Sequence, residues 1–269
     1  MDILTEIIDY KRKYVEEKKS LYPVKLLEKS FSFFAPTVSL KKYIKRTDLH
    51  GIIAEIKRKS PSKGFINKYA DLESISIGYM QAGASAISVL TDEKYFGGSN
   101  EDLKLVRKFN FCPILRKDFI VDEYQIIEAK SIGADAILLI AAALKEDDVK
   151  KLAKFAKSLS LEVLLEVNNK EEIEKYPNEF IDIVGINNRN LKSFEVDLNR
   201  TINLINHIPK NFIKISESGI KTPEEAYKLK QNGADGFLIG GLFMSASQPE
   251  KECASFINKL KQMQEIANL

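Results

Sequence analysis

The sequence predicts an α/β fold: a single (β/α)8 barrel of the TIM-barrel class with an N-terminal helical extension. The first observation is that eight strand-like runs alternate with helical patterns along 269 residues. Strands that alternate with helices form parallel sheets, and eight units fit a closed barrel better than an open sheet of five or six strands. The second is a repeat of Gly-Ala at 83–84, 133–134 and 233–234, each where a helix ends and a strand begins. Glycine there supplies the left-handed conformation that ends a helix.

The first fifty residues precede the barrel. Residues 2–19 form an amphipathic helical pattern, in which the apolar stripe consists of Ile3, Leu4, Ile7, Ile8, Tyr14 and Val15. Residues 20–50 are mixed in character, with Pro23 and Pro36 as breakers and a short helix expected near 39–46. We therefore expect one domain over residues 1–269, of which 1–50 are the extension.

The barrel elements follow in order. Strands are expected at 52–57, 84–90, 113–117, 135–140, 161–166, 181–186, 212–216 and 235–239. Helical patterns between and after them include 99–109, 122–131, 145–158, 222–231 and 250–266. No linker or low-complexity segment interrupts this series, which favours one continuous barrel.

Composition excludes several classes of function. The net charge is only +3, from 41 basic and 38 acidic residues, so no nucleic-acid partner is expected. Two distant cysteines and two isolated histidines make neither a disulfide framework nor a metal cluster, and we expect no metal. The longest apolar run, 136–144, is too short to cross a bilayer, and the N-terminus lacks the pattern of a signal peptide. No membrane partner and a cytoplasmic location are therefore expected.

Ionisable side chains occur where four of the predicted strands end. Active sites of these barrels lie at the carboxyl ends of the strands, and alternate strands contribute to one layer of the interior. The first, third, fifth and seventh strands bring Glu55 with Lys57, Lys117, Glu166 and Glu217. Because buried charges are costly unless paired, four strands that converge in this way indicate a catalytic cluster. Both faces of a parallel strand are buried, so the sequence does not decide which face points inward.

Two further features point to a phosphorylated substrate with an aromatic ring. Ser218-Gly219 and Gly240-Gly241 follow the seventh and eighth strands, where barrels commonly bind phosphate on backbone N–H groups. Phe96 and Phe119 follow the second and third strands and could bracket a ring.

Seven motifs then identify a family. In order they are IAEIKRKSPSKG (53–64), ISVLTDEKYFGGS (87–99), PILRKDFI (113–120), GADAILLI (133–140), LLEVN (164–168), GINNRNL (185–191) and SESGI (216–220). Together with the leading segment 3–19, they resemble indole-3-glycerol-phosphate synthase over essentially the whole chain. The resemblance implies closure of a carboxyphenylamino-deoxyribulose phosphate to an indole, with loss of carbon dioxide and water and without a metal or organic cofactor.

The resemblance also implies residue roles. It matches Lys117 to the general acid, Glu166 to the carboxylate that assists as a base or stabilises the cation on nitrogen, and Lys57 to a lysine near the substrate carboxylate. Glu55, Asn187 and Glu217 complete the catalytic set. The substrate-binding positions are Ser60, Arg189, Ser218, Phe96, Phe119, Leu138 and Leu191, and the phosphate-binding positions are Gly219, Gly240 and Gly241.

Some points stay open at this level. The resemblance does not divide the proton transfers between Lys57 and Lys117, which could crowd each other and so lower a lysine pKa. Asn168 and Gly241 depart from the histidine and the acidic residue that many relatives carry. The alternatives are a Schiff-base aldolase that uses Lys117 and a non-catalytic barrel that serves as a scaffold. We expect a monomer or weak homo-oligomer.

Overall fold

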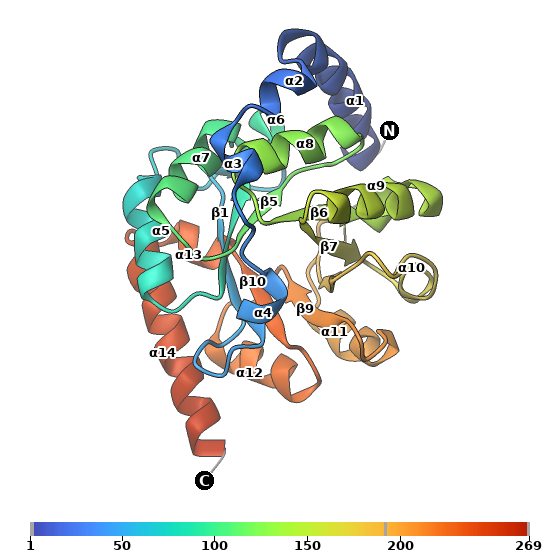
Figure 1. Ribbon diagram of the computed structural model, residues 1–269. Coiled ribbons are helices and arrows are strands. Elements are labelled where there is room, and N and C mark those ends of the chain that lie inside the picture. Colours follow the sequence, from blue (N-terminus) through green and yellow to red (C-terminus); the bar gives the residue numbers. More distant parts are fainter. Residues whose placement is uncertain (1–2, 191–192, 268–269) are drawn as a thin grey trace.

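The computed structural model describes residues 3–190 and 193–267, and its central feature is a closed parallel barrel (Figure 1). Around the barrel the strand order is β1, β10, β9, β8, β7, β6, β5, β4, and back to β1. The strands are β1 (Ile52–Ile56), β4 (Ala86–Leu90), β5 (Ile114–Lys117), β6 (Ala136–Ile140), β7 (Glu162–Val167), β8 (Ile183–Asn187), β9 (Ile213–Glu217) and β10 (Gly236–Ile239). The predicted fold class and its eight strands are confirmed.

Helices connect the strands. They are α5 (Leu72–Gln81), α6 (Glu93–Phe96), α7 (Asn100–Phe109), α8 (Glu123–Ser131), α9 (Glu146–Ser158), α10 (Lys170–Lys175), α11 (Asn199–Leu204), α12 (Pro223–Gln231), α13 (Gly241–Ser245) and α14 (Pro249–Ala267), with short 3-10 turns at Ala141–Ala143 and Ile205–His207. The three repeated glycines, Gly83, Gly133 and Gly233, all have φ near or above 90°, as their predicted role at helix ends requires.

Side chains alternate between two cores along each strand. Ile53, Leu115 and Leu164 belong to a buried cluster inside the barrel, whereas neighbours such as Ile52 and Leu165 pack between the sheet and the helices. The inward set continues at the carboxyl ends of the strands as ionisable residues. The structure thus settles which face of each strand points inward.

The N-terminal extension reaches both ends of the barrel. It consists of α1 (Ile3–Leu21), α2 (Val24–Leu27), α3 (Phe31–Phe34) and α4 (Leu40–Ile44). Figure 1 shows α1 and α2 at the top of the view and α4 near the bottom. Leu40 and Ile44 of α4 are buried in the inner cluster, so α4 closes the amino-terminal end of the barrel.

Two smaller findings complete the fold. A two-stranded antiparallel sheet, β2 (Lys59–Ser60) with β3 (Gly64–Phe65), lies in the loop after β1 and was not predicted from the sequence. Within the part of the chain that the structure describes, no helix combines the length and the apolar character needed to cross a membrane.

Candidate active site

A cavity of about 600 Å³ opens at the carboxyl ends of the strands. The structure brings together along its wall nearly all site residues that the sequence singles out: Glu55, Lys57, Ser60, Phe96, Lys117, Phe119, Leu138, Glu166, Asn187, Arg189, Glu217, Ser218, Gly219, Gly240 and Gly241. Leu191 lies outside the described residues. These residues are far apart in the sequence. They meet because all strands of a parallel barrel have their carboxyl ends on the same side.

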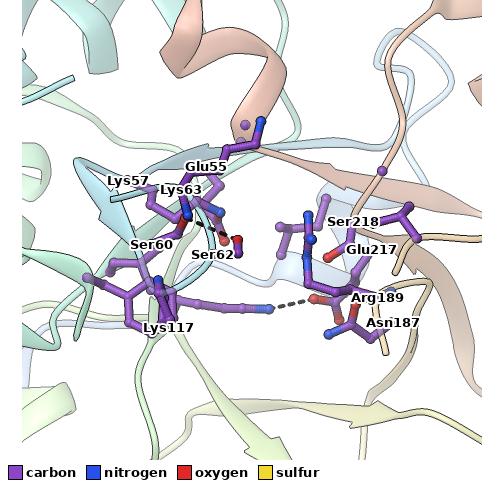
Figure 2. A pocket seen from close by; sticks show the side chains of 18 of the residues that line it. Glu55, Lys57, Ser60, Ser62, Lys63, Lys117, Asn187, Arg189, Glu217 and Ser218 are labelled. Carbon is purple, nitrogen blue, oxygen red and sulfur yellow. Dashed lines mark hydrogen bonds and ion pairs between the residues drawn. The ribbon is translucent and has the colours of Figure 1, made fainter. Parts of the chain in front are cut away.

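Lys117 lies at the centre of the ionisable cluster. Its side chain extends across the cavity toward Glu217 and Asn187 (Figure 2), and Nζ lies 2.5 Å from Glu217 Oε2 and 3.2 Å from Glu166 Oε2. Burial alone would lower the pKa of the Lys117 ammonium, but the carboxylates of Glu217, Glu166 and Glu55 outweigh it and raise the pKa above its ordinary value. Lys117 is therefore protonated at neutral pH.

This finding corrects the expected crowding of the two lysines. Lys57 Nζ lies 2.5 Å from Glu55 Oε1, so each lysine has carboxylate partners of its own. A neighbouring cation would lower the pKa of Lys117, whereas the surrounding carboxylates raise it. For Lys117 the expectation of a lowered pKa was wrong, because the sequence does not show how many carboxylates meet one ammonium group.

Glu217 is the most deeply buried of the carboxylates, at 1% exposure. Burial raises its pKa to about 7, and Lys117 counteracts this only in part. Its Oε1 has no hydrogen-bond partner among the described residues. A Cβ added at Gly185 would lie 2.1 Å from this oxygen, so the side chain of Glu217 occupies space that only a glycine leaves free.

A second acidic residue is accommodated in the same way. A Cβ at Gly240 would lie 2.5 Å from Glu55 Oε1 and 2.8 Å from Glu55 Cβ. Gly240 therefore makes room for Glu55, a role that the sequence did not reveal. Gly185 of β8 and Gly240 after β10 thus leave space for the two acidic side chains of the cavity.

Asn187 is the last residue of β8 and Arg189 follows the strand, and both are held by backbone and side-chain contacts. Asn187 Nδ2 donates to Glu166 Oε1 (2.9 Å), and Asn187 Oδ1 accepts from the backbone N–H of Arg189 (2.9 Å). The Arg189 guanidinium donates to the carbonyl of Phe194 (2.9 Å). The bond from Asn187 holds the Glu166 carboxylate in its position beside Lys117.

The loops after β9 and β10 form the small-residue side of the cavity. Ser218 and Gly219 both have positive φ, 68° and 86°, which is uncommon for a serine and turns the backbone sharply. A Cβ at Gly241 meets no described atom within 4 Å, so the backbone at the start of α13 is accessible. Lys63 and Lys221 also line the cavity, and sequence reasoning missed both. Their signal was weak because lysine is common on solvated loops.

The opposite side of the cavity is apolar. The rings of Phe96 and Phe119 lie 6.0 Å apart between centroids, at 38° to each other. Ile3, Leu4 and Ile7 of α1 line the cavity as well, although the sequence pointed to no site residue in α1. The sequence shows the apolar stripe of this helix, but it does not show which surface the stripe covers.

Among the described residues, no group of three or more His, Cys, Asp or Glu side chains is arranged to hold a metal ion. The groups that line this cavity include ammonium, carboxylate, amide, guanidinium and hydroxyl groups.

Comparisons with known proteins agree on one family. A family model described as indole-3-glycerol phosphate synthase matches residues 4–256. Proteins named indole-3-glycerol phosphate synthase are similar over nearly their whole length. One from Bacteroides thetaiotaomicron is 46% identical over 260 residues, covering 97% of this chain and 99% of the relative. One from Thermoanaerobacter pseudethanolicus is 42% identical over 259 residues, covering 96% and 98%.

Solved structures share the fold at low identity. Thiamine phosphate pyrophosphorylase from Pyrococcus furiosus aligns with a TM-score of 0.61 at 14% identity and covers 83% of this chain and 98% of its own. 3-Hexulose-6-phosphate synthase from Salmonella typhimurium aligns with a TM-score of 0.63 at 10% identity and covers 79% and 99%. At such identity these two structures support the barrel fold alone.

Proposed function

Since the chain belongs to the indole-3-glycerol phosphate synthase family, we propose how its cavity carries out that family's reaction. The enzyme is a carboxy-lyase of tryptophan biosynthesis. It closes 1-(2-carboxyphenylamino)-1-deoxyribulose 5-phosphate to indole-3-glycerol phosphate and releases carbon dioxide and water. The roles of individual residues below are our proposal.

The substrate spans the cavity from its apolar side to its glycine-rich side. The carboxyphenyl ring lies against Phe96, Phe119 and Leu138, with Ser60 near the ring's edge. The phosphate binds to backbone N–H groups at Gly219, Gly240 and Gly241, and Ser218 supports this loop. Lys63 and Lys221 favour an anion there because both line the same cavity. Leu191 remains a predicted contact of the ring.

Ring closure begins at Lys117. The ring carbon that carries the carboxylate attacks the ketone carbon, and Lys117 gives its proton to the ketone oxygen as the carbon–carbon bond forms. A developing alkoxide is more basic than the amine that Lys117 becomes on losing its proton, so the raised pKa of Lys117 does not prevent this transfer. Glu217 and Glu166 hold the ammonium in place.

The later steps use the remaining charged groups. The bond between the ring carbon and the carboxylate breaks and carbon dioxide leaves. The electron pair of that bond stays with the ring and restores its aromaticity. Glu166, oriented by Asn187, stabilises the positive charge on nitrogen or takes the proton lost in the last step. Lys57, paired with Glu55, lies near the substrate carboxylate and supplies a proton as the hydroxyl leaves as water. Arg189 orients the substrate.

The single observation that carries this proposal is the Lys117 ammonium between two carboxylates inside the cavity. Replacing Lys117 with alanine removes the acid of the first step, and general acid catalysis contributes about 10²–10⁴-fold. We expect kcat for Lys117→Ala to fall by at least about 100-fold, measured by the indole fluorescence of the product. Binding of indole-3-glycerol phosphate, measured by calorimetric titration, should persist.

Two results would contradict it. A Lys117→Ala enzyme with near-normal turnover removes Lys117 from the mechanism. Inactivation by borohydride in the presence of substrate, through a trapped imine on Lys117, would favour the Schiff-base aldolase instead.

We further propose that residues 1–269 form one domain and that the protein is a monomer or weak homo-oligomer in the cytoplasm. The near-neutral charge balance, +3 overall, argues against a nucleic-acid partner. Sedimentation equilibrium at micromolar concentration tests the assembly state, and a tight dimer or larger species would contradict it.

A further inference from the structure

Helix α1 forms part of the cavity wall although it lies outside the barrel. Ile3, Leu4 and Ile7 line the cavity, and Ile7 is only 3% exposed. These residues belong to one stripe of the helix, because positions three and four apart share a face. Whatever fixes α1 against the barrel therefore also shapes the cavity.

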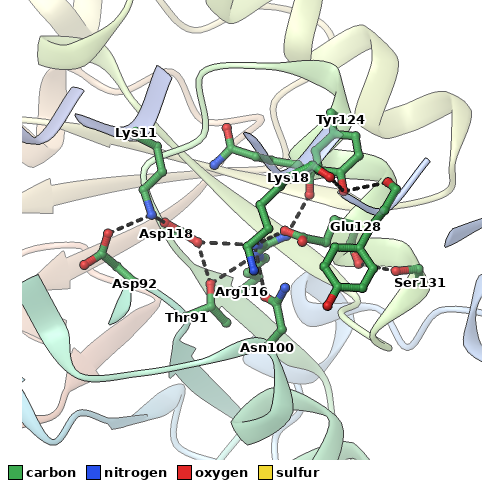
Figure 3. A network of polar contacts seen from close by, with 12 residues as sticks. Lys11, Lys18, Thr91, Asp92, Asn100, Arg116, Asp118, Tyr124, Glu128 and Ser131 are labelled. Atoms are coloured by element: carbon green, nitrogen blue, oxygen red, sulfur yellow. Dashed lines mark hydrogen bonds and ion pairs between the residues drawn. The ribbon is translucent and has the colours of Figure 1, made fainter. Parts of the chain in front are cut away.

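The next residue on this face of α1 is a buried lysine. Lys11 is 2% exposed, and its Nζ lies 2.7 Å from Asp92 Oδ2 and 2.8 Å from Asp118 Oδ1. Figure 3 shows Lys11 between these two aspartates. A buried ammonium is costly unless it is paired, so the two carboxylates determine where α1 can dock. The mechanism described above makes no use of Lys11.

Each aspartate also bonds to the backbone of a segment that carries an aromatic residue of the cavity. Asp92 caps α6 by accepting from the backbone N–H of Tyr95 (2.7 Å), and α6 ends at Phe96. Asp118 accepts from the backbone N–H of Phe119 (2.8 Å). One ammonium group thus ties α1 to the two segments that carry the paired rings.

Asp118 has additional partners that make it a rigid anchor. Its Oδ2 accepts from Thr91 Oγ1 (2.6 Å) and lies 3.3 Å from Arg116 Nη2. Burial would raise the pKa of the Asp118 carboxyl, but Lys11 and Arg116 outweigh it and hold the pKa below its ordinary value. Asp118 is therefore charged at neutral pH, and Lys11 binds to a fixed carboxylate.

We propose that Lys11 is a positioning residue for the aromatic end of the substrate, because it fixes α1, Phe96 and Phe119 around one side of the cavity. The inference rests on the proposed function of this cavity. Lys11 acts through Asp92 and Asp118 and does not contact the catalytic groups. Loss of Lys11 should therefore weaken binding of the ring and leave the proton transfers of Lys117 nearly intact.

A purely structural role makes a different prediction, and a second, more exposed lysine of α1 provides the comparison. Lys19 lies on the same helix and pairs with Asp122 (2.8 Å) just before α8. Neither residue lines the cavity. Lys19→Met loosens α1 at its far end, whereas Lys11→Met loosens it at the cavity.

The experiment compares KM and kcat of the wild type, Lys11→Met, Lys11→Arg and Lys19→Met by product fluorescence, below the unfolding temperature of each variant. We expect Lys11→Met to raise KM about tenfold with kcat within about threefold, which is the signature of lost binding alone. Lys11→Arg should restore most of the affinity, and Lys19→Met should match the wild type. Inhibition by inorganic phosphate should be the same in all four proteins.

Several results would overturn the inference. One is an unchanged KM for Lys11→Met with only a lower unfolding temperature. Another is an equal rise of KM in Lys11→Met and Lys19→Met, which would assign the effect to general loosening of α1. A third is equal weakening of phosphate inhibition. If Lys11→Met does not fold, Asp92→Asn, which keeps an acceptor for the Tyr95 N–H, takes its place with the same expectations.

The outcome is separable from that of the proposed function. If Lys117→Ala loses turnover while Lys11→Met keeps its KM, only the role of Lys11 fails. If Lys117→Ala stays active, the proposed mechanism fails whatever Lys11 does.

Discussion

Glu217 is a carboxyl group of the cavity whose ionisation its surroundings disfavour. It is 1% exposed, and it lies near two other carboxylates, those of Glu166 and Glu55, which oppose its charge. Lys117 offsets this in part, with its ammonium nitrogen 2.5 Å from Glu217 Oε2. The raised pKa of about 7 means that Glu217 exchanges a proton in the pH range where the enzyme is expected to work.

The stability of the protein should therefore depend on pH through Glu217. Between its ordinary pKa of 4.5 and its folded value of about 7, the folded state holds a proton that the unfolded state has lost. The contribution of Glu217 to the free energy of unfolding is thus fully present below pH 4.5, and it is lost as the pH rises to about 7. The loss is up to about 3 kcal/mol, and urea unfolding at pH 5 and pH 8 measures it.

Glu217→Gln provides the comparison for this prediction. Glutamine keeps the shape of the glutamate side chain and cannot ionise. The stability of the wild type relative to this variant should therefore fall as the pH rises from 5 to 8. A difference that stays constant from pH 5 to pH 8, or grows in favour of the wild type, would contradict it.

At the scale of elements, β5 works on both of its faces. Leu115 and Lys117 point into the barrel, whereas Ile114 and Arg116 point toward the surrounding helices. Arg116 is 2% exposed and pairs with Glu128 of α8 at 2.5 Å, and its Nη1 donates to the carbonyl of Gln125 at 2.8 Å. The strand that carries the general acid is thereby fixed to the helix that follows it.

Removing Arg116 should be costly. Arg116→Met leaves Glu128 buried without its main cationic partner, and breaking a buried ion pair in this way costs about 3–5 kcal/mol. Urea unfolding measures the loss. Lys104→Met, which breaks the exposed pair of Lys104 with Glu101, is the control and should change stability little. Similar losses in the two variants would contradict the importance of this buried pair.

At the scale of the whole molecule, the barrel closes where β1 meets β10. Ile52 pairs with Phe237 and Ile53 with Leu238. Gly51 enters this seam with φ of 72°, and a Cβ there would lie 2.4 Å from the carbonyl oxygen of Asp235. Because that oxygen belongs to the backbone, it cannot move aside as a flexible side chain could.

Gly51→Ala should therefore destabilise the barrel twice over. The positive φ is unfavourable for alanine, and the added Cβ also clashes with the backbone of Asp235. Gly64 is the matched control, since its φ is 67° and a Cβ added there meets no described atom within 4 Å. We expect about 1 kcal/mol of lost stability for Gly64→Ala and about 3 kcal/mol or more for Gly51→Ala, measured by urea unfolding. Equal losses would show that the seam tolerates a side chain.

Much of this organisation could be predicted from the sequence, and the reason is local periodicity. The eight strands follow from short apolar runs between helical patterns, and the parallel topology then places Glu55, Lys117, Glu166 and Glu217 at one end. Contacts between distant segments could not be predicted in this way. Lys11 reads as one more charge on an amphipathic helix, because Asp92 and Asp118 lie far along the chain.

The seam between β1 and β10 also has a consequence during synthesis of the chain. The ribosome makes β1 near the beginning of the barrel and β10 only at its end, and at the usual rate of elongation the delay is roughly ten to forty seconds. Throughout that time one edge of β1 has no partner, and an unpaired apolar edge is a template for aggregation. The nascent protein thus stays exposed to aggregation through this edge until its last strand leaves the ribosome.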